Sequence, residues 1–155
     1  MSVSFVNKNQ KSTYEKLLPL VEKFKKRAFK IDEEGTFPFE NIQELKEAGY
    51  TRLSLESKYG GDELRLYDFL LFQELIAQGD ASTALSIGWH MGITMDLREK
   101  QPWNQQMLDF IFKEIEKGAL INTAATEPKT GSPTRGGKPE TTAVKTKEGW
   151  RINGR

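Results

Sequence analysis

The chain has 155 residues, 37% of them hydrophobic and 29% charged, a globular composition long enough for one domain or for one domain and part of another. Its 23 basic and 22 acidic residues give a formal net charge of +1, which argues against nucleic acid or an anionic membrane surface as a partner. It has no cysteine, which excludes disulfides, thiolate metal sites and a cysteine nucleophile and fits a reducing cytoplasm.

An amphipathic helix is predicted over residues 12–31, where apolar residues recur at three- and four-residue steps. The stretch before it is polar and no apolar run reaches the roughly 18 residues of a membrane span, so we expect neither a secretory signal nor a transmembrane helix. Pro19 should start or bend this helix because it has no amide proton. The charged face is interpreted as a solvated surface.

A second helix is predicted within residues 37–49. Pro38 stands near its first turn, where proline is favoured, and a glycine ends it. Phe39, Ile42 and Leu45 are expected to face the core.

Residues 66–78 are apolar on almost every side, which predicts a third helix at the centre of a bundle. Gly79 should end that helix and Asp80 should cap the next one. The next helix begins near Ala81 and is built largely of small residues.

Gly88 and Gly92 lie one turn apart in this fourth helix. Because a glycine inside a helix costs about 1 kcal/mol relative to alanine, something is expected to approach the backbone closely there. The approaching group is either a neighbouring helix or a ligand chain. The single histidine, His90, has no second ligand at a suitable spacing, so we expect a buried structural histidine and no metal site.

A last helix is predicted at 104–117, with Met107, Leu108, Ile111 and Ile115 on one side. After it the pattern changes, and we place a domain boundary near Gly118. The later segments are a short strand at 119–125, a loop at 129–139, a half-buried strand at 142–146 and, after a hairpin turn, a strand at 150–153.

The loop between residues 123 and 132 is the part of the chain best suited to a cofactor. Backbone groups and the Thr126 hydroxyl can hydrogen-bond an uncharged isoalloxazine ring, and Gly131-Ser132 can offer close donors to a pyrophosphate. The usual nucleotide motifs, G-x-G-x-x-G and the P-loop, are absent. From these residues alone, a polar loop without a ligand is the favoured interpretation.

Short motifs along nearly the whole chain resemble the acyl-CoA dehydrogenase family in type and in order. The most specific is Thr126-Glu127-Pro128 followed by Gly131-Ser132, which resembles the flavin-binding signature of that family. The other matching segments are 37–38 leading into 45–49, 59–61, 74–77 with 80–82, and 149–154.

The resemblance implies a mainly α fold, with an N-terminal helical bundle at 1–118 followed by the first strands of an incomplete β-barrel domain at 119–155. In this family FAD lies between the β domain and a C-terminal helical domain. The residues that fall at the family's cofactor contacts are Thr123, Ala124, Ala125, Thr126, Gly131 and Ser132. The residues that fall at substrate contacts are Ser132, Ser86, Ile87 and His90.

The family activity implied is FAD-dependent oxidation of an acyl-CoA thioester to a trans-2-enoyl-CoA. The catalytic base of relatives belongs to the C-terminal helical domain, so no catalytic residue is assigned here. Because the chain stops soon after Asn153-Gly154, a dipeptide typical of hairpin turns, we expect an inactive fragment. The implied partners are an acyl-CoA and an electron-transfer flavoprotein, in a cytoplasmic tetramer.

Three positions depart from the family pattern, which usually has an aromatic residue in place of Thr123, a glycine in place of Lys129 and an aspartate in place of Pro133. Pro133 removes an amide donor from the loop, and Lys129 is expected to face water. Two alternatives stay open: a flavin-dependent monooxygenase or acyl-CoA oxidase of the same fold, and a non-catalytic helical interaction module.

Overall fold

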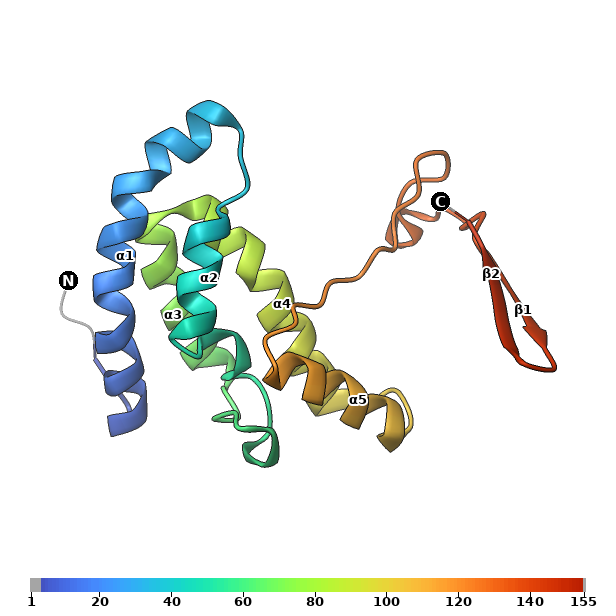
Figure 1. Ribbon diagram of the computed structural model, residues 1–155, viewed down its shortest axis with the longest axis horizontal. Coiled ribbons are helices and arrows are strands. Elements are labelled where there is room, and N and C mark those ends of the chain that lie inside the picture. The colour runs from blue at the N-terminus through green and yellow to red at the C-terminus, as the bar shows by residue number, and fades with distance from the viewer. Residues whose placement is uncertain (1–3, 155) are drawn as a thin grey trace. The chain divides into compact units, whose positions relative to one another are not determined.

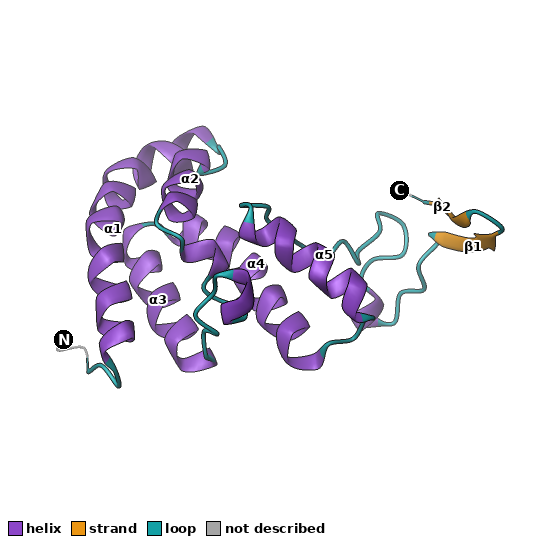
Figure 2. Ribbon diagram, turned by 60° about the horizontal axis from the view of Figure 1, so that its bottom comes forward, coloured by secondary structure: helices purple, strands orange, loops and turns teal. Residues whose placement is uncertain are grey.

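The computed structural model describes residues 4–154, which divide into two units, one up to Asn122 and one from Thr123 onward. Within the described residues the first unit holds all five α-helices and the second holds a two-stranded antiparallel sheet (Figures 1 and 2). The predicted mainly α fold with β strands at its C-terminal end is confirmed. The predicted boundary near Gly118 stays a prediction.

The first helix, α1, spans Lys8–Glu34 and is longer than the sequence pattern predicts. Asn7 caps its start, since the Asn7 side chain accepts a hydrogen bond from the amide of Gln10, and Gly35 ends it in a left-handed conformation with φ of 60°. Pro19 lies inside the helix, so the idea that it starts the helix is wrong. Leu17, Val21 and Phe24 are buried, as their spacing predicts.

The second helix, α2, spans Phe39–Glu47 with Pro38 at its N-cap. Ile42 and Leu45 are buried as predicted, but Phe39 is 75% exposed, so its predicted inward orientation is wrong. Phe39 stands at the first helical position and packs edge-on against Phe37 instead, with ring centroids 4.8 Å apart.

Helices α3 (Leu66–Gly79) and α4 (Ala81–Lys100) are joined by Asp80, whose carboxylate accepts hydrogen bonds from the amides of Ser82 and Thr83. This confirms the predicted cap. Helix α3 packs against α1 on one side and α4 on another, and together with α2 they enclose the main core (Figure 1).

Helix α3 contacts both α1 and α4, which agrees with its predicted central place in the bundle, but its apolar surface is only partly covered. Phe72, Leu75 and Ile76 are buried against α1 and α4. Leu66 and Leu70, however, are 62% and 56% exposed. In the described residues, neighbouring helices therefore cover only part of the apolar surface of α3.

The last helix, α5 (Gln105–Glu116), helps to build a second, smaller core. Leu108, Phe112 and Ile115 pack there with side chains from α4 and from the loop that holds the short 3₁₀-helices η1 (Tyr50–Arg52) and η2 (Ser57–Tyr59). Met107, which the sequence pattern places on the apolar side of this helix, is 48% exposed.

In the second unit, β1 (Thr142–Thr146) and β2 (Gly149–Asn153) form the predicted hairpin, with Thr142 opposite Asn153 and Thr146 opposite Gly149. Both strands are exposed along their whole length, so the predicted half-burial of β1 is wrong within this unit. The predicted strand at 119–125 is also wrong, because residues 119–125 form no β-strand in the structure. A strand exists only with a hydrogen-bonded neighbour.

Candidate functional site

The predicted cofactor loop starts as an extended, exposed segment. Thr123, Ala124, Ala125 and Thr126 are all exposed. The loop then turns back on itself: the amide of Gly131 donates to the carbonyl of Glu127 at 2.9 Å, and the amide of Glu127 donates to the carbonyl of Gly131 at 3.2 Å. The uncharged segment at 123–126 is therefore exposed and lies just before a closed turn.

Gly131 and Ser132, the predicted donors to a pyrophosphate, are held differently from each other. The amide of Gly131 is engaged by Glu127, and Gly131 has a left-handed φ of 69°, which favours glycine. Ser132 is half-buried, and its hydroxyl lies 2.8 Å from the hydroxyl of Thr134. A single 3₁₀ turn, η3 (Pro133–Arg135), follows and begins with the proline that departs from the family pattern.

A shallow hollow of about 500 Å³ lies beside this loop. Lys129 and Glu140 stand on its rim, with the ammonium and carboxylate 3.6 Å apart and both side chains more than half exposed. Such an exposed pair contributes little stability, so the Lys129 charge is available to an anionic ligand. The residues lining the hollow are Glu127, Pro128, Lys129, Glu140, Asn153 and Gly154.

Glu127 is the residue of this loop that sequence reasoning missed. Its carboxylate accepts hydrogen bonds from the amides of Glu140 and Thr141, at 2.6 and 2.9 Å. Hydrogen bonds from Thr141 and Glu140 lower the pKa of this carboxyl. Its place inside the Thr-Glu-Pro motif could have revealed it. A carboxylate beside a proposed anionic ligand would repel that ligand unless other groups bound the carboxylate.

The predicted substrate residues of α4 do not share one environment. Ile87 is fully buried in the main core, whereas Ser86 is half-buried and its hydroxyl donates to the carbonyl of Ser82 at 2.8 Å. His90 is 2% exposed. Of the three, only Ser86 has a side chain near the surface of the helix.

His90 is held by backbone groups on both ring nitrogens. Nε2 lies 2.8 Å from the carbonyl of Thr51, and Nδ1 accepts from the amide of Ile121 at 3.1 Å. This pattern requires the neutral tautomer with the proton on Nε2. Burial lowers the pKa of the imidazole, with a further contribution from Lys46. The prediction of a buried structural histidine is confirmed.

The two glycines of α4 have different surroundings. A side chain at Gly88 would place its Cβ 2.5 Å from Nε2 of Gln73, whose amide donates to the carbonyl of Ala84 at 2.8 Å. A Cβ at Gly92 would meet no atom within 4 Å. The neighbouring helix therefore accounts for Gly88, through Gln73 of α3, and leaves Gly92 open.

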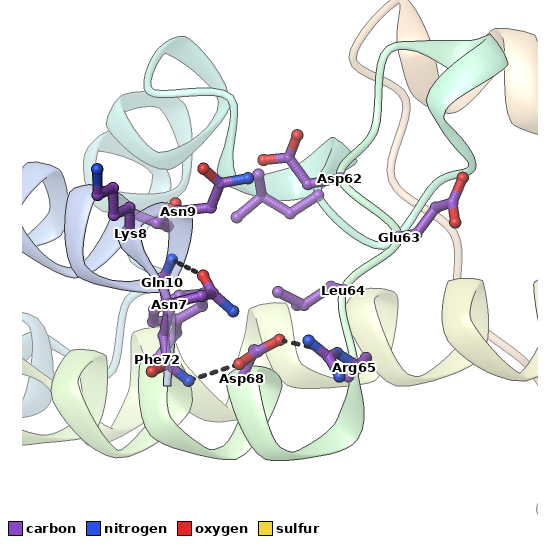
Figure 3. Close-up of a pocket in the computed structure, with 12 residues that line it drawn as sticks. Asn7, Lys8, Asn9, Gln10, Asp62, Glu63, Leu64, Arg65, Asp68 and Phe72 are labelled. Atoms are coloured by element: carbon purple, nitrogen blue, oxygen red, sulfur yellow. Dashed lines mark hydrogen bonds and ion pairs between the residues drawn. The ribbon is translucent and has the colours of Figure 1, made fainter. Parts of the chain in front are cut away.

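A second hollow, of about 270 Å³, lies between the start of α1 and the start of α3 (Figure 3). Its polar groups bind one another: Gln10 donates to Asp68 at 2.6 Å, and Arg65 lies 3.9 Å from the same carboxylate. Sequence motifs do not mark this place.

Across residues 4–154, no cluster of three His, Cys, Asp or Glu residues is arranged to hold a metal. In the same residues, no helix is long and apolar enough to cross a membrane.

Comparison with known proteins agrees with the motifs. Residues 9–100 match the family model described as acyl-CoA dehydrogenase, N-terminal domain. A protein of Bacillus subtilis (strain 168) with the provisional name acyl-CoA dehydrogenase YdbM is 49% identical over 155 residues, the whole of this chain. The chain spans 41% of that relative's length. The chain belongs to the acyl-CoA dehydrogenase family.

Proposed function

We propose that residues 1–118 are the N-terminal helical domain, and 119–155 the first part of the flavin-binding β domain, of an FAD-dependent acyl-CoA dehydrogenase. The observation that carries this proposal is the exposed, uncharged segment 123–126 leading into the turn closed by Glu127 and Gly131. It stands within a chain whose family is established by the match over residues 9–100.

The donor set of the loop fits FAD. The Thr126 hydroxyl and the exposed backbone of Thr123, Ala124 and Ala125 are uncharged partners for the carbonyls and nitrogens of an isoalloxazine ring. Ser132 supplies a hydroxyl, Gly131 lets a ligand approach the backbone, and the mostly exposed ammonium of Lys129 suits an anionic pyrophosphate. A buried acid would oppose that anion, but the carboxylate of Glu127 is turned to the amides of Glu140 and Thr141.

When bound, the flavin supplies the redox chemistry by accepting a hydride from an acyl-CoA thioester. The part of this chain is to bind and orient. Ser132 is proposed to meet both the cofactor and the thioester. On α4, Ser86 is proposed to border the acyl chain, with Ile87 and His90 fixing the helix beneath it. No residue of the chain is assigned to proton removal.

The electron acceptor proposed is an electron-transfer flavoprotein or a similar carrier, and the assembly proposed is a cytoplasmic tetramer. An acyl-CoA oxidase or flavin monooxygenase would share the loop and differ in its use of oxygen. Reduction of an electron-carrier dye without oxygen consumption would support the dehydrogenase.

FAD binding by the protein at its full natural length tests the proposal. We expect the purified protein to hold FAD and the variant Thr126→Val to bind it about tenfold more weakly, the loss of roughly one hydrogen bond. Thr142→Val, on exposed β1, is the matched control and should bind normally. A colourless protein whose melting temperature is unchanged by added FAD would contradict the proposal and favour an interaction module, because a ligand of the native state must stabilise it.

A further inference from the structure

The loop that follows Thr126 is closed twice. Close to its start, the paired hydrogen bonds between Glu127 and Gly131 make a short turn. Farther along, the Glu127 side chain reaches the amides of Glu140 and Thr141, which are 13 and 14 residues away in sequence. Glu127 thus closes the short turn through its backbone and the longer loop through its side chain.

Each carboxylate oxygen of Glu127 has its own amide partner. Oε2 accepts from Glu140 at 2.6 Å, and Oε1 accepts from Thr141 at 2.9 Å. The Thr130 hydroxyl adds a longer contact to Oε2 at 3.4 Å. Two neighbouring amides bound by two oxygens of one carboxylate form a charge-assisted pair with a fixed geometry, which a neutral or shorter side chain cannot reproduce.

The interior of the loop is packed tightly enough to respond to that pair. A Cβ at Gly137 would lie 2.1 Å from the carbonyl oxygen of Thr130, so glycine is required where the two arms of the loop cross. The amide of Gly137 also donates to the carbonyl of Ser132 at 3.3 Å. Ser132 is therefore held to Gly137 inside the segment that Glu127 closes.

We infer that ionised Glu127 is a positioning residue: it latches the start of the loop to the start of β1 and so sets the places of Thr126, Gly131 and Ser132. The inference deepens the proposed function and rests on it where the flavin is concerned. The latch itself is a property of this chain alone.

A latch made by a carboxylate depends on pH. Its hydrogen bonds lower the pKa of Glu127 from an ordinary value of 4.5, so the latch contributes fully above 4.5 and is lost as pH falls through the lowered value. The charged side chains bordering the same hollow are Lys129 and Glu140, which pair with each other. Because the carboxylate of Glu140 borders the same hollow, the assay must follow individual amides rather than a global signal.

The test is nuclear magnetic resonance of the isotope-labelled 155-residue chain. In the wild type, the amide signals of Glu140 and Thr141 should shift together as pH falls, with a midpoint below 4.5. In Glu127→Gln the shift of the Thr141 amide should vanish, and near neutral pH both amides should exchange with solvent about threefold faster or more, because a charge-assisted acceptor is lost. Glu148→Gln, in the hairpin turn, is the matched control and should behave as the wild type.

Unchanged amide exchange and an unchanged titration in Glu127→Gln would overturn the latch. Glu127→Asp keeps the charge but is too short to reach both amides. Partial loss in this variant with full loss in the glutamine variant would support the latch.

FAD binding distinguishes the latch from the proposed flavin-binding function. Weaker FAD binding by the Glu127→Gln full-length protein, together with the amide changes, supports both; amide changes in a protein that binds no FAD support the latch and contradict the proposed function.

Discussion

The amide of Ile121 donates a hydrogen bond to Nδ1 of His90 over 3.1 Å, which fixes the segment after α5 to the middle of α4. The opposite ring nitrogen, Nε2, lies 2.8 Å from the carbonyl of Thr51 in η1. One buried imidazole thus joins three parts of the first unit that are distant in sequence. Histidine is needed here because only a neutral imidazole can donate from Nε2 and accept at Nδ1 at the same time.

Acidification should destabilise the first unit through His90. Burial lowers the pKa of the folded imidazole below 6.5, so the unfolded state binds a proton first and stability falls as pH drops below 6.5. Thermal unfolding of the wild type and of His90→Gln between pH 5 and 8 measures this. The variant should be less stable at pH 8, by about 1 to 3 kcal/mol for the lost acceptor, and its stability should depend less on pH. An identical pH dependence in both proteins would contradict the account.

Removal of the buried Asn41 side chain should be costly. Asn41 is fully buried, donates to the Thr83 hydroxyl at 2.9 Å and accepts from Arg27 at 2.9 Å. Asn41→Ala removes both buried hydrogen bonds, although Arg27 keeps Glu44 and Thr83 keeps Asp80, so we expect a loss of about 1 to 3 kcal/mol in chemical denaturation. Gln43→Ala, an exposed position on the same helix, should change stability by no more than about 0.5 kcal/mol. Equal losses of stability in Asn41→Ala and Gln43→Ala would show that the hydrogen bonds of Asn41 do not stabilise the fold.

Gly88 and Gly92 make a matched pair on α4. Alanine at Gly92 meets no atom within 4 Å, so Gly92→Ala should stabilise by up to about 1 kcal/mol through helix propensity. Alanine at Gly88 would push the Gln73 amide away from the Ala84 carbonyl and strain its bond with the Tyr50 hydroxyl. That loss should offset the gain, leaving Gly88→Ala less stable than Gly92→Ala by about 1 kcal/mol. Chemical denaturation measures both variants. Equal stabilisation by Gly88→Ala and Gly92→Ala would contradict a steric conflict between the methyl group added at Gly88 and the Gln73 amide.

Sequence pattern predicted the elements of this protein better than their surroundings. Helix α4 and its Asp80 cap follow from residue types that act locally. Phe39 was expected to face the core because apolar spacing identifies a face of a helix, yet spacing does not say whether a neighbour covers that face. The strand predicted at 119–125 is absent for a similar reason: a strand depends on a hydrogen-bonded neighbour, which apolar pattern alone does not identify.

The candidate site was predictable to a similar extent. Motif order marked the residues from Thr123 to Ser132, because glycine and hydroxyl residues in a short loop carry a recognisable pattern. It did not reveal the reach of Glu127 to Glu140 and Thr141, since a contact across 13 or 14 residues depends on how the loop folds. Nor did it show that Ile87 and His90 lie beneath the surface of α4 while Ser86 borders it.

The most direct test of the proposed function is the visible absorbance of the full-length protein, for which we propose a bound flavin, during titration without oxygen with acyl-CoA thioesters of increasing chain length. The account predicts that at least one acyl-CoA bleaches the bound flavin, and that an electron-carrier dye restores the colour. A tightly held flavin that no acyl-CoA reduces would contradict it.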